Sequence, residues 1–225
     1  MGNLGETLME ELNCETVFSI GGIGIAESVV VTWIIMAVVV AASILLTRNL
    51  KVEHPGRGQL MLEYAVTWLQ GIGKGIVGEE GEAYASYLTS VLIYLGIANL
   101  IGILGFKPPT KDLNVTAALA VMSIILIEAA GIRKKGMKRW LKSFTEPVVL
   151  VTPINILELF IKPLSLCMRL FGNVLGAFVI MKLIENICKV GLPVVFSLYF
   201  DLFDGLIQAY VFVFLTGLFI KEALE

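Results

Sequence analysis

The sequence predicts an all-α protein that crosses a membrane about five times. Of its 225 residues, 57% are hydrophobic and only 16% are charged, and the mean hydropathy is +0.85. A soluble domain does not tolerate so apolar a composition. The apolar residues also gather into stretches of at least the roughly 20 residues that a helix needs to cross about 30 Å of hydrocarbon. We therefore interpret the chain as an integral membrane protein.

The five predicted transmembrane helices differ in how sharply they are delimited. The first two contain no charged residue, and the third carries only Glu128 near one end. The last two come from a long apolar stretch that a few charges interrupt. The predicted helices cover residues 28–47, 84–106, 113–132, 147–190 and 192–221.

Basic residues are unevenly distributed over the connecting segments. Four follow the first predicted helix and six follow the third, whereas only Lys107 and Lys111 separate the second from the third. Because cytoplasmic loops carry the excess of lysine and arginine, residues 48–83 and 132–146 are expected in the cytoplasm. The N-terminal tail, residues 1–27, has no basic residue and is expected outside, with the C-terminus inside.

The first cytoplasmic segment contains an apolar run, Gln59 to Val77, that is not expected to cross. Glu63, Gln70 and three glycines interrupt it and leave too short an apolar stretch. We interpret it as a helix that lies in the membrane interface.

No cofactor, metal or nucleic-acid site is predicted. The glycine-rich runs GIGKG (71–75) and GGIGIAE (21–27) fit neither common phosphate-binding pattern. The single histidine, His54, lies in a turn rich in Pro and Gly, and the three cysteines lack the spacing of metal ligands.

A stripe of polar and small residues runs along the fourth predicted helix. Its members are spaced three or four residues apart, which places them on one face of an α-helix. They are Asn155, Glu158, Lys162, Ser165, Arg169, Asn173 and Gly176. As a helix the stretch 147–190 would be about 66 Å long, twice the hydrocarbon thickness. It must therefore tilt steeply or break, and Pro163 could kink it.

Arg169 is the least expected member of this stripe. An arginine at the centre of a bilayer costs about 3 kcal/mol on insertion scales, and more on a lone helix. It therefore needs a partner in another chain, a carboxylate of its own chain, or a route for its side chain to the headgroups. The same choice applies to Lys162, which is nearer a possible interface.

The last predicted helix carries a second polar face. Asp201, Asp204 and Gln208 are spaced three and four residues apart. If the last two helices form an antiparallel hairpin, Gln208 should lie near Asn173 and Arg169. A further polar line on the fourth helix, Phe178, Lys182 and Glu185, would lie roughly opposite the Arg169 face. There, Lys182 and Asp201 could also form an ion pair that only holds the hairpin together.

The stretch PINILELFIKPLSLCMRLFGN (153–173), followed by QAYVFVFLTGLFI (208–220), closely resembles subunit a of the F-type ATP synthase. The segment PPTKDLNVTAALA (108–120) is similar to the P-T-x-D-x-N-x-T segment of that family. The resemblance covers roughly residues 84–220 and excludes the N-terminal tail. It implies that residues 84–225 form the channel domain of a stator subunit.

In that family, an arginine in RLFGN faces a rotating ring of c subunits, each of which carries a carboxylate within the membrane. Two half-channels, one from each side of the membrane, lead ions to and from this ring. The resemblance gives Arg169 this role and aligns Asn173 and Gln208 with polar positions of the family. A guanidinium suits the role because it keeps its proton and cannot relay protons itself.

Other candidates follow from the resemblance. Asp201 lies seven residues before the glutamine, where many relatives carry a titratable group, and is expected on the extracytoplasmic path. Many bacterial relatives have a glutamate nine residues after the arginine, where this chain has Phe178, so Glu185 is expected to take over that task with Asp201. Glu158 and Asn155 are expected toward the cytoplasmic exit. The remaining candidates are Lys162, Ser165 and Asp204.

The implied partners are the ring of c subunits, the b subunits of the peripheral stalk and membrane lipid, in the inner membrane of a bacterial cell. The chain would not be catalytic by itself, and either protons or sodium could be the coupling ion. Two other interpretations of the residues remain. An ion-coupled secondary transporter also keeps ionisable residues at mid-membrane, although no internal repeat is found here. In a structural assembly subunit, Arg169 would be only a packing partner.

Overall fold

The computed structural model describes residues 16–20, 23–48, 50–51, 55–104, 107–145, 149–187 and 192–224. Two strands, β1 (Thr16–Ile20) and β2 (Ile23–Ala26), precede the first helix. The α-helices are α2 (Glu27–Thr47), α3 (Arg57–Val77), α4 (Glu82–Leu100), α5 (Leu113–Lys135), α6 (Met137–Ser143), α7 (Thr152–Ile187), α8 (Leu192–Ser197) and α9 (Gly205–Leu224). Short 3₁₀ turns cover Glu79–Gly81, Ile101–Leu104, Pro109–Lys111 and Val149–Val151. A π-helical segment, Leu198–Asp204, joins α8 to α9.

Helices dominate the described chain, which confirms the all-α fold class. Within the described residues, five helical stretches are long and apolar enough to cross a membrane, as the sequence predicts. They are Glu27–Thr47, Glu79–Ile103, Leu113–Lys135, Thr152–Ile184 and Val195–Leu224. The run expected at the interface forms α3, which packs against α4 and α9. Its place at the membrane surface stays a prediction.

Residues 16–26, expected to be part of a tail, contain an antiparallel pair of strands. The register pairs Thr16 with Ala26 and Ile20 with Ile23. β-branched and aromatic residues such as Thr16, Val17 and Phe18 favour an extended backbone. The pair leads directly into α2, so the N-terminal region is not wholly irregular.

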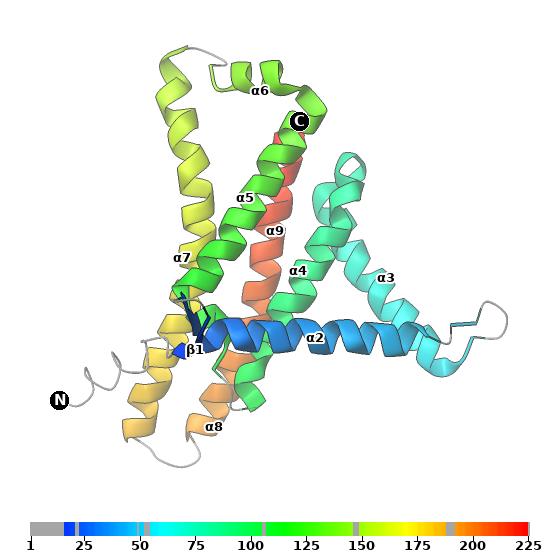
Figure 1. Cartoon of the computed structure of the whole chain (residues 1–225), viewed down its shortest axis with the longest axis vertical. Helices are drawn as coiled ribbons and strands as arrows, with labels where there is room; N and C mark the ends of the chain where they lie inside the picture. Colours follow the sequence, from blue (N-terminus) through cyan, green and yellow to red (C-terminus); the bar gives the residue numbers. More distant parts are fainter. Residues whose placement is uncertain are drawn as a thin grey trace.

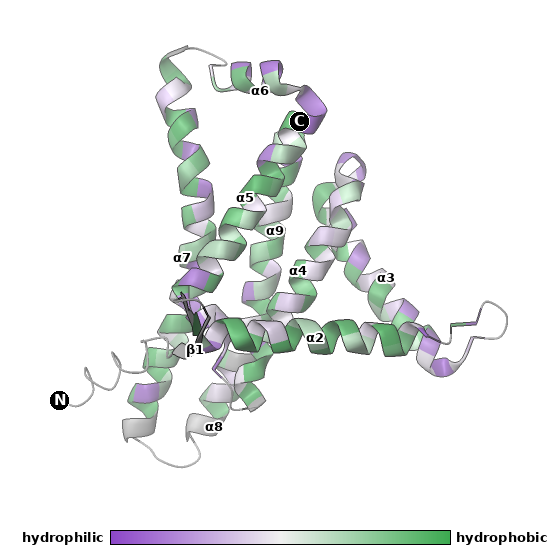
Figure 2. Cartoon of the chain, viewed as in Figure 1, coloured by the Kyte–Doolittle hydropathy of each residue, from purple (hydrophilic) through white to green (hydrophobic). Residues whose placement is uncertain are grey.

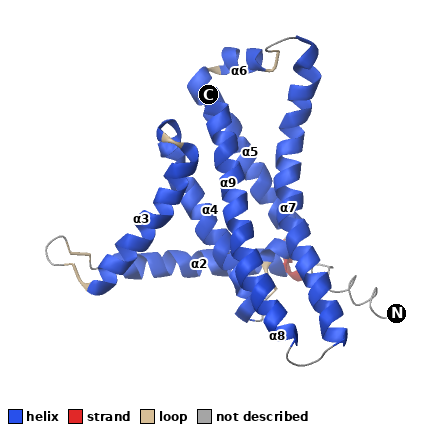
Figure 3. Cartoon of the chain, turned by 180° about the vertical axis from the view of Figure 1, so that it is seen from behind, coloured by secondary structure: helices blue, strands red, loops and turns tan. Residues whose placement is uncertain are grey.

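The core lies among α4, α5, α7 and α9, which lie side by side (Figures 1 and 3). Its largest buried side chains include Leu88, Leu95, Ile127, Phe212 and Ile220. Helix α3 packs on this bundle through a small residue of α9. A Cβ atom on Gly217 would lie only 2.5 Å from Ile76 Cγ2, so the glycine lets the two helices approach closely.

Helix α2 runs across the direction of α5, α7 and α9 (Figure 1), and Figure 2 shows that it is apolar along most of its length. It contacts the bundle through Val31 and Ile35, which pack with Ala98 of α4, and most of its other residues are exposed. Such a helix suits a lipid environment. Because α2 runs across α7, α7 must tilt steeply if α2 crosses the bilayer directly. Helix α7 has 36 residues and is about 54 Å long, longer than the membrane is thick.

The last two predicted helices differ in whether they are continuous. Helix α7 continues through Pro163 from Thr152 to Ile187, so the proline does not end it. The last predicted helix is interrupted instead, because the π-helical segment separates α8 from α9. Such segments often accompany functional sites, since the extra residue rotates the side chains that follow.

Candidate functional site

The polar stripe of the fourth predicted helix lies entirely on α7. At its centre, Ser165, Arg169 and Asn173 are all exposed, whereas Leu166 and Leu170 of the same turns are buried in the core. The helix therefore uses one side to hold the bundle together, while the central part of the stripe stays accessible.

Arg169 has no partner among the residues that the structure describes. No hydrogen bond or ion pair joins its guanidinium to any of their atoms. No carboxylate of the described residues forms an ion pair with Arg169. A charge in this position is available to a group outside the chain.

Asn173, one turn beyond Arg169, meets the last helix. Its Nδ2 donates to Gln208 Oε1 at 3.0 Å and to Asp204 Oδ1 at 3.2 Å. This contact agrees with the hairpin register expected from the sequence. Gln208 is 4% exposed, and its Nε2 is buried without a hydrogen-bond partner in the described structure. An unmet buried donor is costly, so this amide is suited to an additional acceptor.

The end of the π-helical segment is fixed by two residues that sequence reasoning missed. Asn99 of α4 donates through Nδ2 to the carbonyl oxygen of Gly205 at 2.8 Å, and Thr110 Oγ1 donates to Asn99 Oδ1 at 2.8 Å. A Cβ on Gly205 would lie 3.0 Å from Asn99 Cβ, so only glycine fits without a shift. Asn99 is the single amide in the stretch 84–106, a signal that could have identified it.

The second polar line of α7 is partly described. Lys111 Nζ lies 3.5 Å from the centre of the Phe178 ring, and Lys182 Nζ lies 5.7 Å from it. Two cations thus lie close to the Phe178 ring, whose face attracts positive charge. The side chains of Glu185 and Asp201 lie outside the described structure, and with them the expected Lys182–Asp201 pair.

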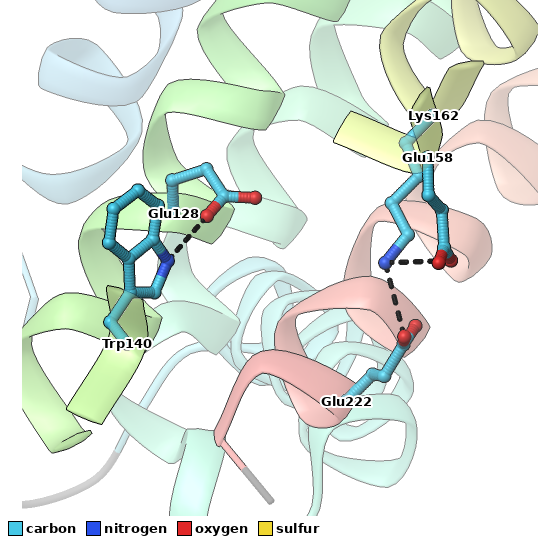
Figure 4. Close-up of polar contacts among 5 residues, drawn as sticks. All are labelled: Glu128, Trp140, Glu158, Lys162 and Glu222. Atoms are coloured by element: carbon cyan, nitrogen blue, oxygen red, sulfur yellow. Dashed lines mark hydrogen bonds and ion pairs between the residues drawn. The ribbon is translucent and has the colours of Figure 1, made fainter. Parts of the chain in front are cut away.

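At the α6 end of α7, Lys162 has two partners. Its Nζ lies 3.2 Å from Glu158 Oε1 and 3.1 Å from Glu222 Oε1 of α9 (Figure 4). Lys162 therefore pairs with carboxylates of its own chain, one of the alternatives expected from the sequence. Glu222 was not among the predicted site residues, because a separation of 60 residues leaves no periodic signal.

These residues border a cavity of about 250 Å³ between α5, α6, α7 and α9. Asn155, Glu158 and Lys162 line it, as do Glu128 and Trp140, which the sequence analysis did not assign to a site. Trp140 Nε1 donates to Glu128 Oε2 at 2.8 Å (Figure 4). The cavity therefore brings together three carboxylates and two lysines, which are Glu128, Glu158, Glu222, Lys135 and Lys162.

Comparison with known proteins identifies the family of the chain. Residues 29–221 match the ATP synthase A chain family. The chain is 38% identical to ATP synthase subunit a of Moorella thermoacetica over 92% of its own length and 94% of that protein. It is 33% identical to ATP synthase subunit a 2 of a Bradyrhizobium strain, over 94% and 95% of the two chains. The chain therefore belongs to the ATP synthase subunit a family, as a multi-pass membrane component of an ATP synthase.

Proposed function

We propose that this chain is the ion-translocating stator subunit of a rotary ATP synthase. It provides two half-channels to a rotating ring of c subunits, so that proton or sodium flow drives ATP synthesis at sites on other subunits. The b subunits of the peripheral stalk hold it in place. The protein lies in the inner membrane of a bacterial cell, with its N-terminus outside and its C-terminus in the cytoplasm.

The observation that carries this proposal is the outward-facing Arg169, which has no partner among the described residues. A guanidinium in an apolar environment requires a counter-charge, and a carboxylate on a neighbouring ring meets that need. At about 4 Å and an effective dielectric constant near 20, the attraction is about 4 kcal/mol. That attraction favours release of an ion from the carboxylate, yet it is weak enough for the ring to move on.

The cavity beside α6 supports a cytoplasmic half-channel. It is bordered by Asn155, Glu158 and Lys162 of the polar stripe, which leads along α7 toward Arg169. Carboxylates beside a lysine can exchange ions with water. In this proposal, Ser165 continues the polar path between Lys162 and Arg169.

The contact of α7 with the last helix supports the other half-channel. Asn173, Asp204 and Gln208 form a hydrogen-bonded group one turn from Arg169. Asp201 lies in the π-helical segment that ends at Asp204, and Glu185 lies toward the end of α7. We assign these two carboxylates to the extracytoplasmic path, where Glu185 substitutes for the acid that Phe178 replaces.

Replacing Arg169 tests the proposal. Arg169→Ala and Arg169→Lys should each lower ATP synthesis and ATP-driven ion pumping on the order of a hundredfold or more. Alanine removes the attraction of about 4 kcal/mol, and lysine replaces a permanent charge with one that can lose its proton. Both activities are measured in membrane vesicles that contain equal amounts of assembled complex. Arg133→Ala removes an exposed arginine outside the stripe and should leave them within about twofold of wild type. Retention of coupled pumping by both Arg169 variants would favour a purely structural subunit.

A further inference from the structure

A second, larger cavity lies where α3, α5 and α9 end. Its volume is about 610 Å³, and four basic residues from three helices line it. They are Lys134, Lys135, Arg139 and Lys221. Among the described lining residues the acids are Glu79 and Glu80, so the described lining has a formal net charge of +2. Figure 2 shows the hydrophilic end of α5 beside α6.

The cations of this cavity are only partly neutralised within the chain. Lys134 forms an ion pair with Glu80. Lys135 is half-buried and Arg139 is exposed, and neither has a hydrogen bond or ion pair to a residue that the structure describes. A half-buried lysine and an arginine that converge on one cavity attract an anion, and a phosphate group suits both.

Three features favour a phospholipid over a soluble phosphate as the source of that group. The buried side chains of Val77 and Leu224 give the cavity an apolar part. The cavity adjoins helical stretches that are long and apolar enough to cross the membrane. On α6, Met137 and Leu141 are 60% and 65% exposed, one helical turn apart, beside exposed basic residues. Such a helix suits the headgroup region of a bilayer.

We propose that this cavity binds the headgroup of an anionic phospholipid such as phosphatidylglycerol. Lys135 and Arg139 contact the lipid phosphate, and the start of the acyl chains lies at the apolar part of the cavity near Val77 and Leu224. The bound lipid fills the space between the ends of α3, α5 and α9 and fixes α6 at the membrane surface. This site adjoins the cavity that holds Lys162, because Lys135 lines both cavities, but Arg139, Val77 and Leu224 line only the larger one.

The test counts lipid molecules bound to the purified full chain by native mass spectrometry during titration with phosphatidylglycerol or phosphatidylcholine. Wild-type protein should retain phosphatidylglycerol in preference to phosphatidylcholine. Lys135→Gln with Arg139→Gln should weaken that binding roughly 25-fold, about fivefold for each cation. The matched pair Arg133→Gln with Lys138→Gln removes one arginine and one lysine from the same two helices, at exposed positions outside the cavity. It should change binding by less than about threefold.

A charge-preserving pair, Lys135→Arg with Arg139→Lys, guards against loss of folding and should retain the lipid. Equal weakening by the two glutamine pairs would indicate general attraction to an anionic surface and overturn the site. Equal binding of phosphatidylcholine by wild type would overturn it as well. Displacement of the lipid by millimolar inorganic phosphate would overturn the choice of a lipid as ligand.

Discussion

Lys162 and Arg169 lie on the same side of α7, seven residues and about 10 Å apart along the helix axis. Lys162 is bound by two carboxylates of its own chain, one on α7 and one on α9. Arg169 has no such partner in the described structure and is exposed. The difference shows that two cations in one sequence stripe can serve different purposes. One joins helices around a cavity, and the other is left for a partner.

The same contrast extends to the neighbours of each cation. Around Lys162, the chain supplies Glu222 and the Glu128–Trp140 hydrogen bond from α5, α6 and α9. Near Arg169, the described residues supply the Asn173–Gln208 hydrogen bond one turn away. Substitutions near Lys162 should therefore lower the stability of the subunit, whereas substitutions near Arg169 should affect coupling.

Among residues other than Arg169, the largest effect is expected for Gln208→Leu. The change removes both the acceptor for Asn173 and the buried, unpartnered Nε2, while the buried volume stays similar. Coupled ion pumping should fall roughly tenfold, because Asn173 loses a hydrogen bond worth about 0.5–1.5 kcal/mol and the Nε2 donor is no longer available to a group outside the chain, and the amount of assembled complex should stay the same. Thr216→Val is the matched control, because Thr216 is also buried on α9 but donates only to the carbonyl of Phe212 in its own helix. If the control lost as much pumping as Gln208→Leu, general packing of α9 would explain the effect.

An intermediate effect is expected for Lys162→Met. It leaves Glu158 and Glu222 near each other without their cation, and because both carboxylates are about half exposed, we expect a loss of about 1–2 kcal/mol in the free energy of unfolding. Adding Glu222→Gln should recover part of this loss, as a double-mutant cycle would detect. Arg169→Met should leave the stability of the isolated subunit nearly unchanged. Equal destabilisation by the two methionine variants would remove the contrast between the cations.

The smallest effect is expected for Trp140→Phe. Phenylalanine retains an aromatic ring next to Phe144, whose centre lies 4.9 Å from that of Trp140, but cannot donate to Glu128. The free energy of unfolding should fall by about 0.5–1.5 kcal/mol, the worth of one hydrogen bond. Thermal unfolding of the purified subunit measures it. Trp68→Phe, on an exposed position of α3, should leave the midpoint unchanged.

Periodic features of this chain could be predicted from sequence, and contacts between distant helices could not. The stripe from Asn155 to Gly176 follows from helical spacing, and the register of Gln208 with Asn173 follows from hairpin geometry. Glu222, Trp140 and Thr110 reach their partners only after folding, so no local pattern reveals them, whereas Asn99 could have been identified as the single amide in an apolar stretch. The strands at 16–20 and 23–26 lie where only a tail was expected. The π-helical segment departs from the period of an ideal helix, on which the prediction of one continuous last helix relied.

The most direct test of the central claim is an electron cryo-microscopy map of the assembled complex at side-chain resolution. We predict that the guanidinium of Arg169 lies within about 4 Å of a carboxylate on the neighbouring ring, the range in which their attraction is several kcal/mol. A guanidinium that points to lipid headgroups, away from every other subunit, would contradict it.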